Sequence, residues 1–251
     1  MRRILLYNRI GDLEMYKNFL FDLDGTLLPM DMKYFVKLYV AAFCKTMVPI
    51  TKISADALMD AIWTSVGNMA RNDGNCLNSD IFWQSMNRCC NRDMRIYSDV
   101  IDVFYRTEFD AARASTKVQP LSRLCVELIK AHGGKLIVAT NPIFPKSATY
   151  RRILWAGLDV NDFDYITTND NSSACKPNLN YYEEICSVCG IRPEESIMIG
   201  NDVNEDMPAE RLGFDTFLIT DCLINRDNKE LSLYRHGTFE DFFDFLTDIF
   251  R

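Results

Sequence analysis

The stretch FLFDLDGT, residues 19–26, decides the fold, because an apolar run ends here in two carboxylates, a glycine and a hydroxyl. A strand of a parallel sheet is buried on both faces and is therefore almost entirely apolar. Open α/β sheets bind their ligands beyond the carboxyl ends of such strands, which is where Asp22 and Asp24 would lie. Gly25 allows the backbone to turn tightly or to approach a ligand closely. The stretch predicts a buried strand that delivers two acids to a binding site.

Three later motifs place polar side chains at strand ends or helix starts. The apolar run 136–139 leads into TNP, residues 140–142, and the predicted strand 196–199 leads into GNDVNED, residues 200–206. Between them lies ACKPN, residues 174–178, in which the lysine precedes a proline suited to the first turn of a helix. Each motif alone is compatible with an ordinary turn. Together they give acid, hydroxyl, lysine and second acid pair, in that order.

In order and context the four motifs resemble those of the haloacid dehalogenase superfamily of phosphohydrolases, over about residues 19–219. The resemblance implies an α/β fold, a doubly wound parallel-sheet Rossmann-like core with a helical cap inserted after the first strand. It also implies a phosphatase that forms an aspartyl-phosphate intermediate. One departure is Asn201, which stands between Gly200 and Asp202 where the family pattern has glycine followed directly by aspartate.

The resemblance also implies a role for each motif residue. Asp22 is the expected nucleophile, and Asp24 the acid that protonates the leaving oxygen and later activates water. The expected catalytic group is completed by Thr140 and Lys176. The resemblance implies phosphate contacts from Asp22, Gly25, Thr26, Thr140, Asn141 and Lys176, and metal ligation by Asp22, Asp24 through its carbonyl, and Asp202, with support from Asn201 and Asp206.

Electrostatics requires a cation independently of the resemblance. Asp22, Asp24, Asp202 and Asp206 would bring up to four negative charges to a site that admits a phosphate dianion. Two like charges at about 4 Å repel by on the order of 4 kcal/mol at an effective dielectric constant of about 20, so Lys176 alone does not neutralise the site. Mg²⁺ suits oxygen ligands completed by water and substrate phosphate, and is the expected cofactor.

Composition excludes several classes of protein. The chain has 251 residues, 48% of them hydrophobic, which is enough for a sizeable core. A net charge of −7 argues against a nucleic acid or an anionic membrane as partner. Nine scattered cysteines favour reduced thiols over disulfides. The sequence contains no membrane-spanning apolar run, and its start does not resemble a signal peptide, so a cytoplasmic protein is expected.

The strand pattern pauses between the first and second motifs. From residue 31 to about 114, apolar residues recur at helical spacing, with stretches near 81–89 and 97–112. This predicts a helical cap domain, 30–115, inserted into a catalytic core of residues 17–29 and 116–251. The core should contain helices 121–132, 145–155, 178–189 and 205–212, strands 164–167 and 216–219, and an amphipathic C-terminal helix. Residues 1–16 match no family motif and are expected either to form an N-terminal arm or to precede a start at Met15.

A helical insert directly after the first motif resembles the C1 cap of the superfamily. Such a cap closes over a small active site, which implies a small phosphorylated metabolite rather than a phosphoprotein as substrate. The loop 71–75, between two cap helices, is either a source of substrate contacts or a solvated turn. The sequence does not indicate an oligomeric state.

Other functions stay open at this point. A phosphomutase or another phosphoryl-transferring member would share the motif residues, but neither His132 nor His236 lies in the predicted cap. A phosphonate-cleaving enzyme needs a cap lysine, and the lysines at 33, 37, 45 and 52 all occupy solvated positions of the pattern. A dehalogenase has no need of Asp24. A receiver-like signalling domain would lack the helical insert, whereas a non-catalytic phosphate- or Mg²⁺-binding module is compatible with the full set of motif residues.

Overall fold

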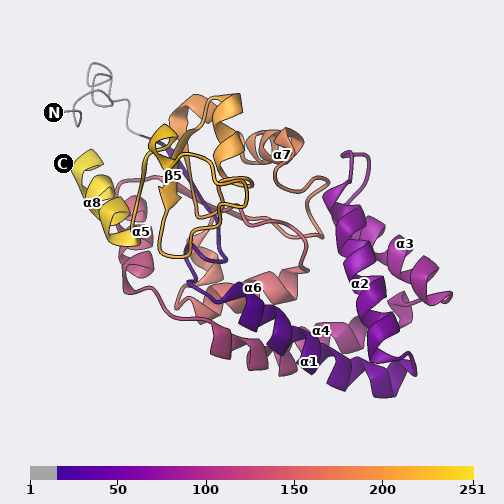
Figure 1. Ribbon diagram of the computed structural model, residues 1–251. Helices are drawn as coiled ribbons and strands as arrows, with labels where there is room; N and C mark the ends of the chain where they lie inside the picture. The colour runs from indigo at the N-terminus through magenta and orange to yellow at the C-terminus, as the bar shows by residue number, and fades with distance from the viewer. Residues whose placement is uncertain (1–15) are drawn as a thin grey trace.

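The computed structural model describes residues 16–251, and its centre is a six-stranded, all-parallel sheet (Figure 1). The strand order is β3-β2-β1-β4-β5-β6. The strands are β1 Asn18–Phe21, β2 Lys135–Val138, β3 Tyr165–Ile166, β4 Ser196–Gly200, β5 Asp215–Ile219 and β6 His236–Gly237. This confirms the predicted doubly wound, Rossmann-like α/β core. Except for Tyr16, the predicted N-terminal arm lies outside the described residues.

Strand β1 lies in the middle of the sheet and fixes where the motifs meet. It pairs in parallel with β2 on one side and β4 on the other, so that Phe21 lies opposite both Val138 and Ile199. The chain first winds to the β2 side and later returns on the β4 side, which makes β1 the point where the winding reverses. Ligands of open α/β sheets bind at such a point. The residues that follow these three strands therefore share one edge.

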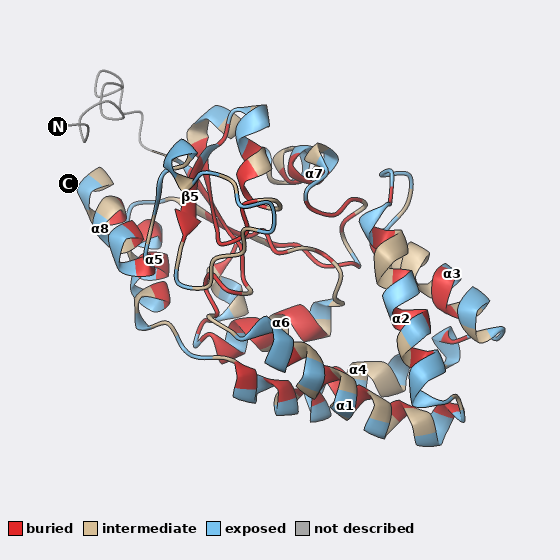
Figure 2. Ribbon diagram, viewed as in Figure 1, coloured by how far each residue is buried: buried red, intermediate tan, exposed pale blue. Residues whose placement is uncertain are grey.

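Helices cover both faces of the sheet (Figures 1 and 2). Phe19 and Phe21 pack towards α5 (Pro120–Ala131) and α8 (Phe239–Ile249), whereas Leu20 packs towards α7 (Leu179–Cys189). The alternation follows from the two-residue period of a strand. The remaining core helix is α6, Lys146–Trp155, and short 3₁₀ segments cover Arg95–Tyr97, Val160–Asp162, Pro193–Glu195, Met207–Leu212 and Leu231–Leu233.

Most of the chain between β1 and α5 is helical, and this part is called the insert below. It consists of α1 Met32–Thr51, α2 Ala55–Ala70, α3 Asn78–Cys90, α4 Ser98–Arg106 and the 3₁₀ segment Glu108–Ser115. An antiparallel bridge between Met30 and Thr116 joins the two ends of the insert. The helix predicted over 97–112 is divided, because Thr107 has φ −129° and ψ −85° and breaks it.

Two local predictions about the core were wrong. Residues 205–212 do not form an α-helix, since Asp202 bonds the N–H groups of Asn204 and Glu205 and only a 3₁₀ segment follows from Met207. Pro177 does not lie in the first turn of α7. The side chain of Asn178 accepts the N–H of Asn180 and caps the helix, which begins at Leu179. Strand β6 was not predicted, because its two residues carry no apolar pattern.

An aromatic cluster joins the insert to the core. Phe144, in the core loop before α6, packs against Phe35 and Tyr39 of α1 and against Phe109, with ring centroids 5.7 to 6.4 Å apart. These residues belong to a hydrophobic cluster that is continuous with the one under α5 and α8. The base of the insert is therefore packed on the core by apolar contacts.

Two further observations concern the chain as a whole. All nine cysteines are free thiols. Among residues 16–251, no helix is both long and apolar enough to cross a lipid bilayer.

Replacing Phe242 in α8 with alanine should lower the free energy of unfolding by about 3–5 kcal/mol, the usual cost of emptying a buried phenylalanine site. Its side chain is fully buried and its ring lies 5.7 Å from that of Phe21. Urea denaturation would measure the change. Leu233→Ala is the control, because Leu233 is 70% exposed and should cost less than about 0.5 kcal/mol. Equal losses in the two variants would contradict the packing of α8.

Candidate active site

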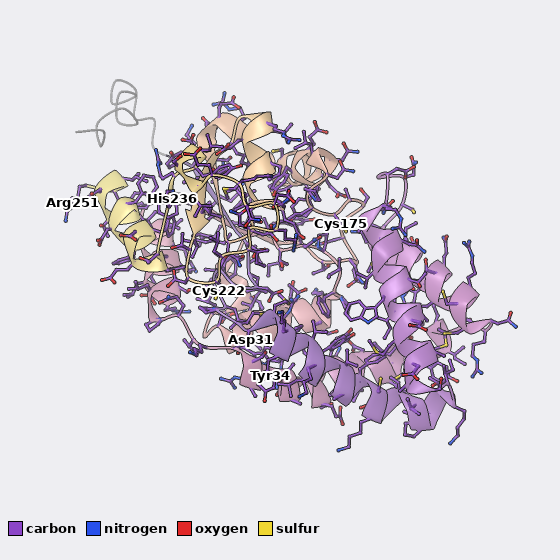
Figure 3. The ribbon with its side chains drawn as sticks, viewed as in Figure 1. Asp31, Tyr34, Cys175, Cys222, His236 and Arg251 are labelled. Carbon is purple, nitrogen blue, oxygen red and sulfur yellow. The ribbon has the colours of Figure 1, made fainter. Side chains whose placement is uncertain are left out.

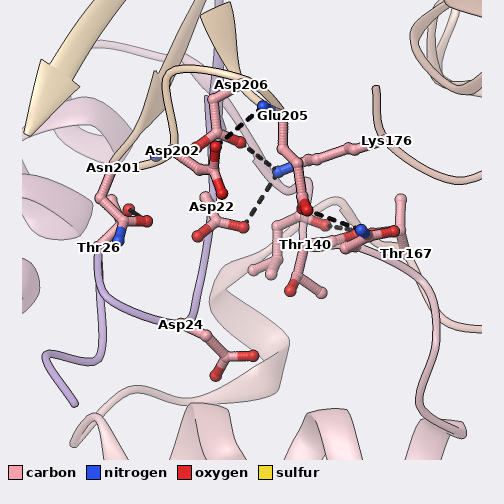
Figure 4. Close-up of polar contacts among 12 residues, drawn as sticks. Asp22, Asp24, Thr26, Thr140, Thr167, Lys176, Asn201, Asp202, Glu205 and Asp206 are labelled. Atoms are coloured by element: carbon pink, nitrogen blue, oxygen red, sulfur yellow. Dashed lines mark hydrogen bonds and ion pairs between the residues drawn. The ribbon is translucent and has the colours of Figure 1, made fainter. Parts of the chain in front are cut away.

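A buried cluster of ion-paired side chains lies at the carboxyl end of β1 (Figure 4). Asp22 follows β1 directly, and its N–H donates to the carbonyl of Ile199 at 2.8 Å. The Lys176 Nζ donates to Asp22 Oδ1 at 3.0 Å and to Asp206 Oδ1 at 2.6 Å. The first, third and fourth sequence motifs therefore converge on a single ammonium group.

The position of Asp206 is fixed from several sides. Its Oδ1 accepts from Lys176 and its Oδ2 accepts the N–H of Asp202 at 2.9 Å. Gly200 is required here, because a Cβ atom at this position would lie 2.1 Å from Asp206 Oδ2. Because both oxygens are engaged by buried donors, Asp206 is suited to support its neighbours rather than to bind a ligand itself.

Burial has a large effect on the pKa values of the ion-paired side chains. It raises the pKa of Asp22 to about 8, against the opposing effect of the Lys176 ammonium. Burial alone would lower the pKa of Lys176, but Asp206 and Asp22 outweigh it and hold that pKa well above the usual value. Lys176 is therefore positively charged. A further positive charge near Asp22 would favour the ionised form of the Asp22 carboxyl group.

Asp202 organises the loop that follows β4. Its Oδ1 accepts the N–H groups of Asn204 and Glu205 at 2.8 and 3.2 Å, and its Oδ2 pairs with the Arg226 guanidinium at 2.9 Å. Burial raises the pKa of Asp202, while these donors oppose the shift. The carboxylate lies beside the Asp206 carboxylate in Figure 4, which brings the second acid pair to the same edge as Asp22.

The hydroxyl motif follows β2 on the other side of β1. Thr140 is buried, and its carbonyl accepts from the hydroxyls of Thr167 at 2.7 Å and Tyr181 at 2.9 Å. The side chain of Asn141 donates to Glu205 at 2.9 Å, while its Oδ1 is buried without a partner. This hydrogen bond links the second motif to the fourth.

Asn201, the departure from the family pattern, links the first motif to the fourth. Its Oδ1 accepts from the Thr26 hydroxyl at 3.3 Å, and its Nδ2 donates to the Cys222 carbonyl at 2.6 Å. Gly25 has a positive φ of 93°, and a Cβ atom there would lie 2.2 Å from the Asn201 amide. Glycine is thus required both by conformation and by space.

Asp24 points away from the other carboxylates (Figure 4). Its Oδ2 forms an ion pair with Arg152 of α6, and its Oδ1 is buried with no hydrogen-bond partner. Burial raises the pKa of Asp24, and Arg152 opposes this shift. Asp24, the residue predicted to act as acid and base, is therefore paired with an arginine that the sequence analysis did not identify.

The oxygen atoms at this edge fit the chemistry of Mg²⁺. Asp22 and Asp202 offer carboxylate oxygens, and Mg²⁺ is usually bound through one or two carboxylates plus water and phosphate. Among the described residues, no three His, Cys, Asp or Glu side chains converge into a complete metal site. A site of this kind would need the predicted main-chain carbonyl of Asp24 and non-protein ligands in addition.

Arg152 and Arg226 change the expected charge balance. The carboxylates of Asp22, Asp24, Asp202, Glu205 and Asp206 face three cations, Lys176, Arg152 and Arg226, so two negative charges remain rather than the larger excess expected with Lys176 alone. The helical spacing of the sequence contains a signal that Arg152 is buried. Arg152 lies four residues after Ala148 on the buried face of α6.

Asn78, at the start of α3, is a second residue that the sequence analysis missed. Its Nδ2 donates to the carbonyls of Pro142 at 3.4 Å and Ala174 at 3.2 Å, and its N–H donates to the Ser172 carbonyl at 2.8 Å. Figure 3 places the neighbouring Cys175 on the side of the core that faces α2 and α3. The far end of the insert is therefore bonded to the loops that carry the second and third motifs.

The loop 71–75 only partly resembles the solvated turn considered above. Its residues are exposed except for Asn72, which is buried and donates to Cys76 O and Asn78 Oδ1, both at 2.8 Å. The lysines at 33, 37, 45 and 52 are exposed. His132 and His236 are exposed and lie outside the insert; Figure 3 labels His236 near the C-terminal helix.

Comparison with known proteins identifies the family of this chain. The sequence profile of the haloacid dehalogenase-like hydrolases matches residues 16–211. A glyceraldehyde 3-phosphate phosphatase from Methanothermobacter thermautotrophicus is 28% identical over 225 residues, which cover 86% of this chain and 92% of the relative.

Solved structures show the same fold. A HAD phosphatase from Thermococcus onnurineus superimposes with a TM-score of 0.57 at 20% identity, covering 92% of this chain and 97% of the other. The hydrolase YfnB from Bacillus subtilis, bound to magnesium, gives a TM-score of 0.55 at 15% identity, covering 93% and 99%. The family identified from the four motifs is thus confirmed, and the chain belongs to the haloacid dehalogenase-like hydrolases.

Proposed function

We propose that this hydrolase is a Mg²⁺-dependent phosphatase that acts on a small phosphorylated metabolite through an aspartyl-phosphate intermediate. The observation that carries the proposal is the ion-paired set of Asp22, Lys176 and Asp206 at the carboxyl end of β1. It combines a carboxylate nucleophile with a buried cation that can offset phosphate charge. The glyceraldehyde 3-phosphate phosphatase from Methanothermobacter supports the same reaction class.

In the first step, an oxygen of Asp22 attacks the phosphorus atom of the substrate. The bond between phosphorus and the leaving oxygen breaks, and that oxygen keeps the electron pair and takes a proton from Asp24. Thr140 and the N–H of Asn141 bind phosphoryl oxygens. Lys176 stabilises the negative charge on the phosphoryl group and holds Asp22 in place.

In the second step, water attacks the phosphorus of the aspartyl-phosphate while Asp24 takes a proton from the water. The bond between phosphorus and Asp22 breaks, its electron pair returns to the carboxylate, and inorganic phosphate leaves. Asp24 has then recovered the proton that it gave to the leaving group. The enzyme is restored, and the net reaction is hydrolysis of a phosphate monoester.

The proposed metal site consists of Asp22, Asp202 and the carbonyl of Asp24, supported by Asp206 and Asn201. Mg²⁺ held there would supply positive charge that offsets the carboxylates and polarises the phosphate. The magnesium-bound YfnB structure shares this fold and is consistent with the proposal.

In this proposal the helical insert, residues 30–115, is a cap domain and the remainder, 17–29 and 116–251, is the catalytic core. The insert contacts the core both at Phe144 and at the loops bonded to Asn78. Such an arrangement restricts access by a folded macromolecule and favours a small substrate. The net charge of −7 also disfavours a polyanionic one.

Chelation should abolish hydrolysis of p-nitrophenyl phosphate, and added Mg²⁺ should restore it whereas added Ca²⁺ should not. Calcium binds more oxygens at longer distances and would displace Asp22 from its attacking position. Steady-state rates in EDTA, with each ion then added in excess, measure this. Full activity in excess EDTA would refute the metal requirement.

Lys176→Met should lower turnover by about 10²-fold or more, because it removes a preorganised charge from the phosphoryl site. The matched control is Lys45→Met, at an exposed position of α1, which should retain the parent rate. Circular dichroism checks that both variants are folded. If Lys176→Met stays within a few-fold of the parent, Lys176 has no role in the chemistry.

Asp22→Asn and Asp24→Asn should fail in different ways. Asp22→Asn removes the nucleophile, so no phosphoenzyme should form with any substrate. Asp24→Asn keeps the nucleophile but lacks the group that activates water, so an activated aryl phosphate should leave a persistent phosphoryl group on Asp22. Rapid quench followed by peptide mass spectrometry distinguishes them. Identical behaviour of the two variants would contradict the assigned roles.

A further inference from the structure

Arg152 is a buried arginine in the core helix α6, with a side chain only 1% exposed. Its guanidinium lies 4.4 Å from the centre of the Phe144 ring. Nε donates to the carbonyl of Ala148 at 3.4 Å and Nη2 to the Thr149 hydroxyl at 3.3 Å, while Nη1 pairs with Asp24. The guanidinium is therefore held by its own helix and by an aromatic face, and it presents one N–H edge to Asp24.

The two oxygens of Asp24 are in different states. Oδ2 is engaged by Arg152, whereas Oδ1 is buried and has no hydrogen-bond partner in the described part of the chain. In a buried ion pair with a purely structural role, hydrogen bonds to the remaining lone pairs normally offset the cost of desolvation. An engaged oxygen beside a free one is instead the arrangement expected of an acid that is oriented by a partner and exchanges its proton at the other oxygen.

We propose that Arg152 is a positioning residue for Asp24, holding one carboxylate oxygen so that the other is available to the leaving group and to the attacking water. The inference rests on the proposed phosphatase function. It adds a residue on α6 to the four motifs and gives that residue a role through Asp24 alone. Arg152 itself touches neither phosphate nor metal.

The location of Arg152 gives this arrangement a rigid support. The Phe144 ring that covers the guanidinium also packs against Tyr39 of the insert, with centroids 5.7 Å apart. The orienting group is therefore anchored in the aromatic cluster between insert and core. An acid held in this way keeps its direction without a hydrogen bond from the loop that follows β1.

The test measures how the rate depends on the leaving group. Parent, Arg152→Met and Arg152→Lys enzymes are assayed with a series of aryl phosphates from p-nitrophenyl phosphate to phenyl phosphate. Phenolate needs protonation more than p-nitrophenolate does. Arg152→Met should therefore lose at least about tenfold more kcat/KM on phenyl phosphate than on p-nitrophenyl phosphate, and Arg152→Lys should recover part of that loss.

A double-mutant cycle separates positioning from general damage. Asp24→Asn should show the same steep dependence on the leaving group, and adding Arg152→Met to it should cost no more than about twofold, because Arg152 acts only through Asp24. Should Arg152→Met not fold, Thr149→Val replaces it. This variant removes the hydroxyl that holds Nη2 and should steepen the same dependence to a smaller extent.

The outcomes are distinguishable. If Arg152→Met slows every aryl phosphate equally, or loses a further tenfold or more on the Asp24→Asn background, the positioning role is wrong while the phosphatase function stands. If Thr149→Val is the variant used, an unchanged dependence on the leaving group overturns the role in the same way. If the parent hydrolyses no aryl phosphate in the presence of Mg²⁺, both proposals fail.

Discussion

The burial of Lys176 between Asp22 and Asp206 is the interaction on which the rest of the structure depends. A buried charge without a partner costs several kcal/mol even after relaxation, and these three residues are at most 8% exposed. Without the ammonium, Asp22 and Asp206 would be left as like charges in a desolvated site. The sheet order satisfies this constraint, because it places the ends of β1 and β4 side by side and leaves the segment before α7 to cover them. The irregular segment 174–178 thus has an electrostatic reason for its position.

The acids of the fourth motif also serve as hydrogen-bond partners for their own backbone. Asp206 accepts the N–H of Asp202, and Asp202 accepts the N–H groups of Asn204 and Glu205, so the loop is held by the groups that define its charge. Such local bonding competes with helix formation. It explains why an apolar pattern near residues 205–212 produces only a 3₁₀ segment. Asn201 connects the loops of the first and fourth motifs, because its side chain accepts a hydrogen bond from Thr26 and packs against Gly25.

The sequence predicted those features whose signal is local. Asp22 and Lys176 stand at the ends of apolar or proline-marked segments, and parallel strands necessarily bring such ends to one edge. The helical insert was predictable from spacing over many residues. The partners of Asp24 and Asn78 were not, because 128 residues separate Asp24 from Arg152 and 96 separate Asn78 from Ala174. Nothing in a helix pattern states which distant group a buried polar side chain will meet.

The contacts of Asn78 determine how the edge of the site can vary among related sequences. Asn78 donates hydrogen bonds to the main-chain carbonyls of Pro142, Ser172 and Ala174. The N–H of Ser79 donates to the main-chain carbonyl of Asn169 in the same way. A backbone acceptor is present whatever side chain the position carries. Substitutions in the segment 169–174 can therefore change the side chains beside the site, while the main-chain hydrogen bonds that hold the insert stay the same. At this end, the insert is attached to the core through main-chain carbonyls and the side chain of one asparagine.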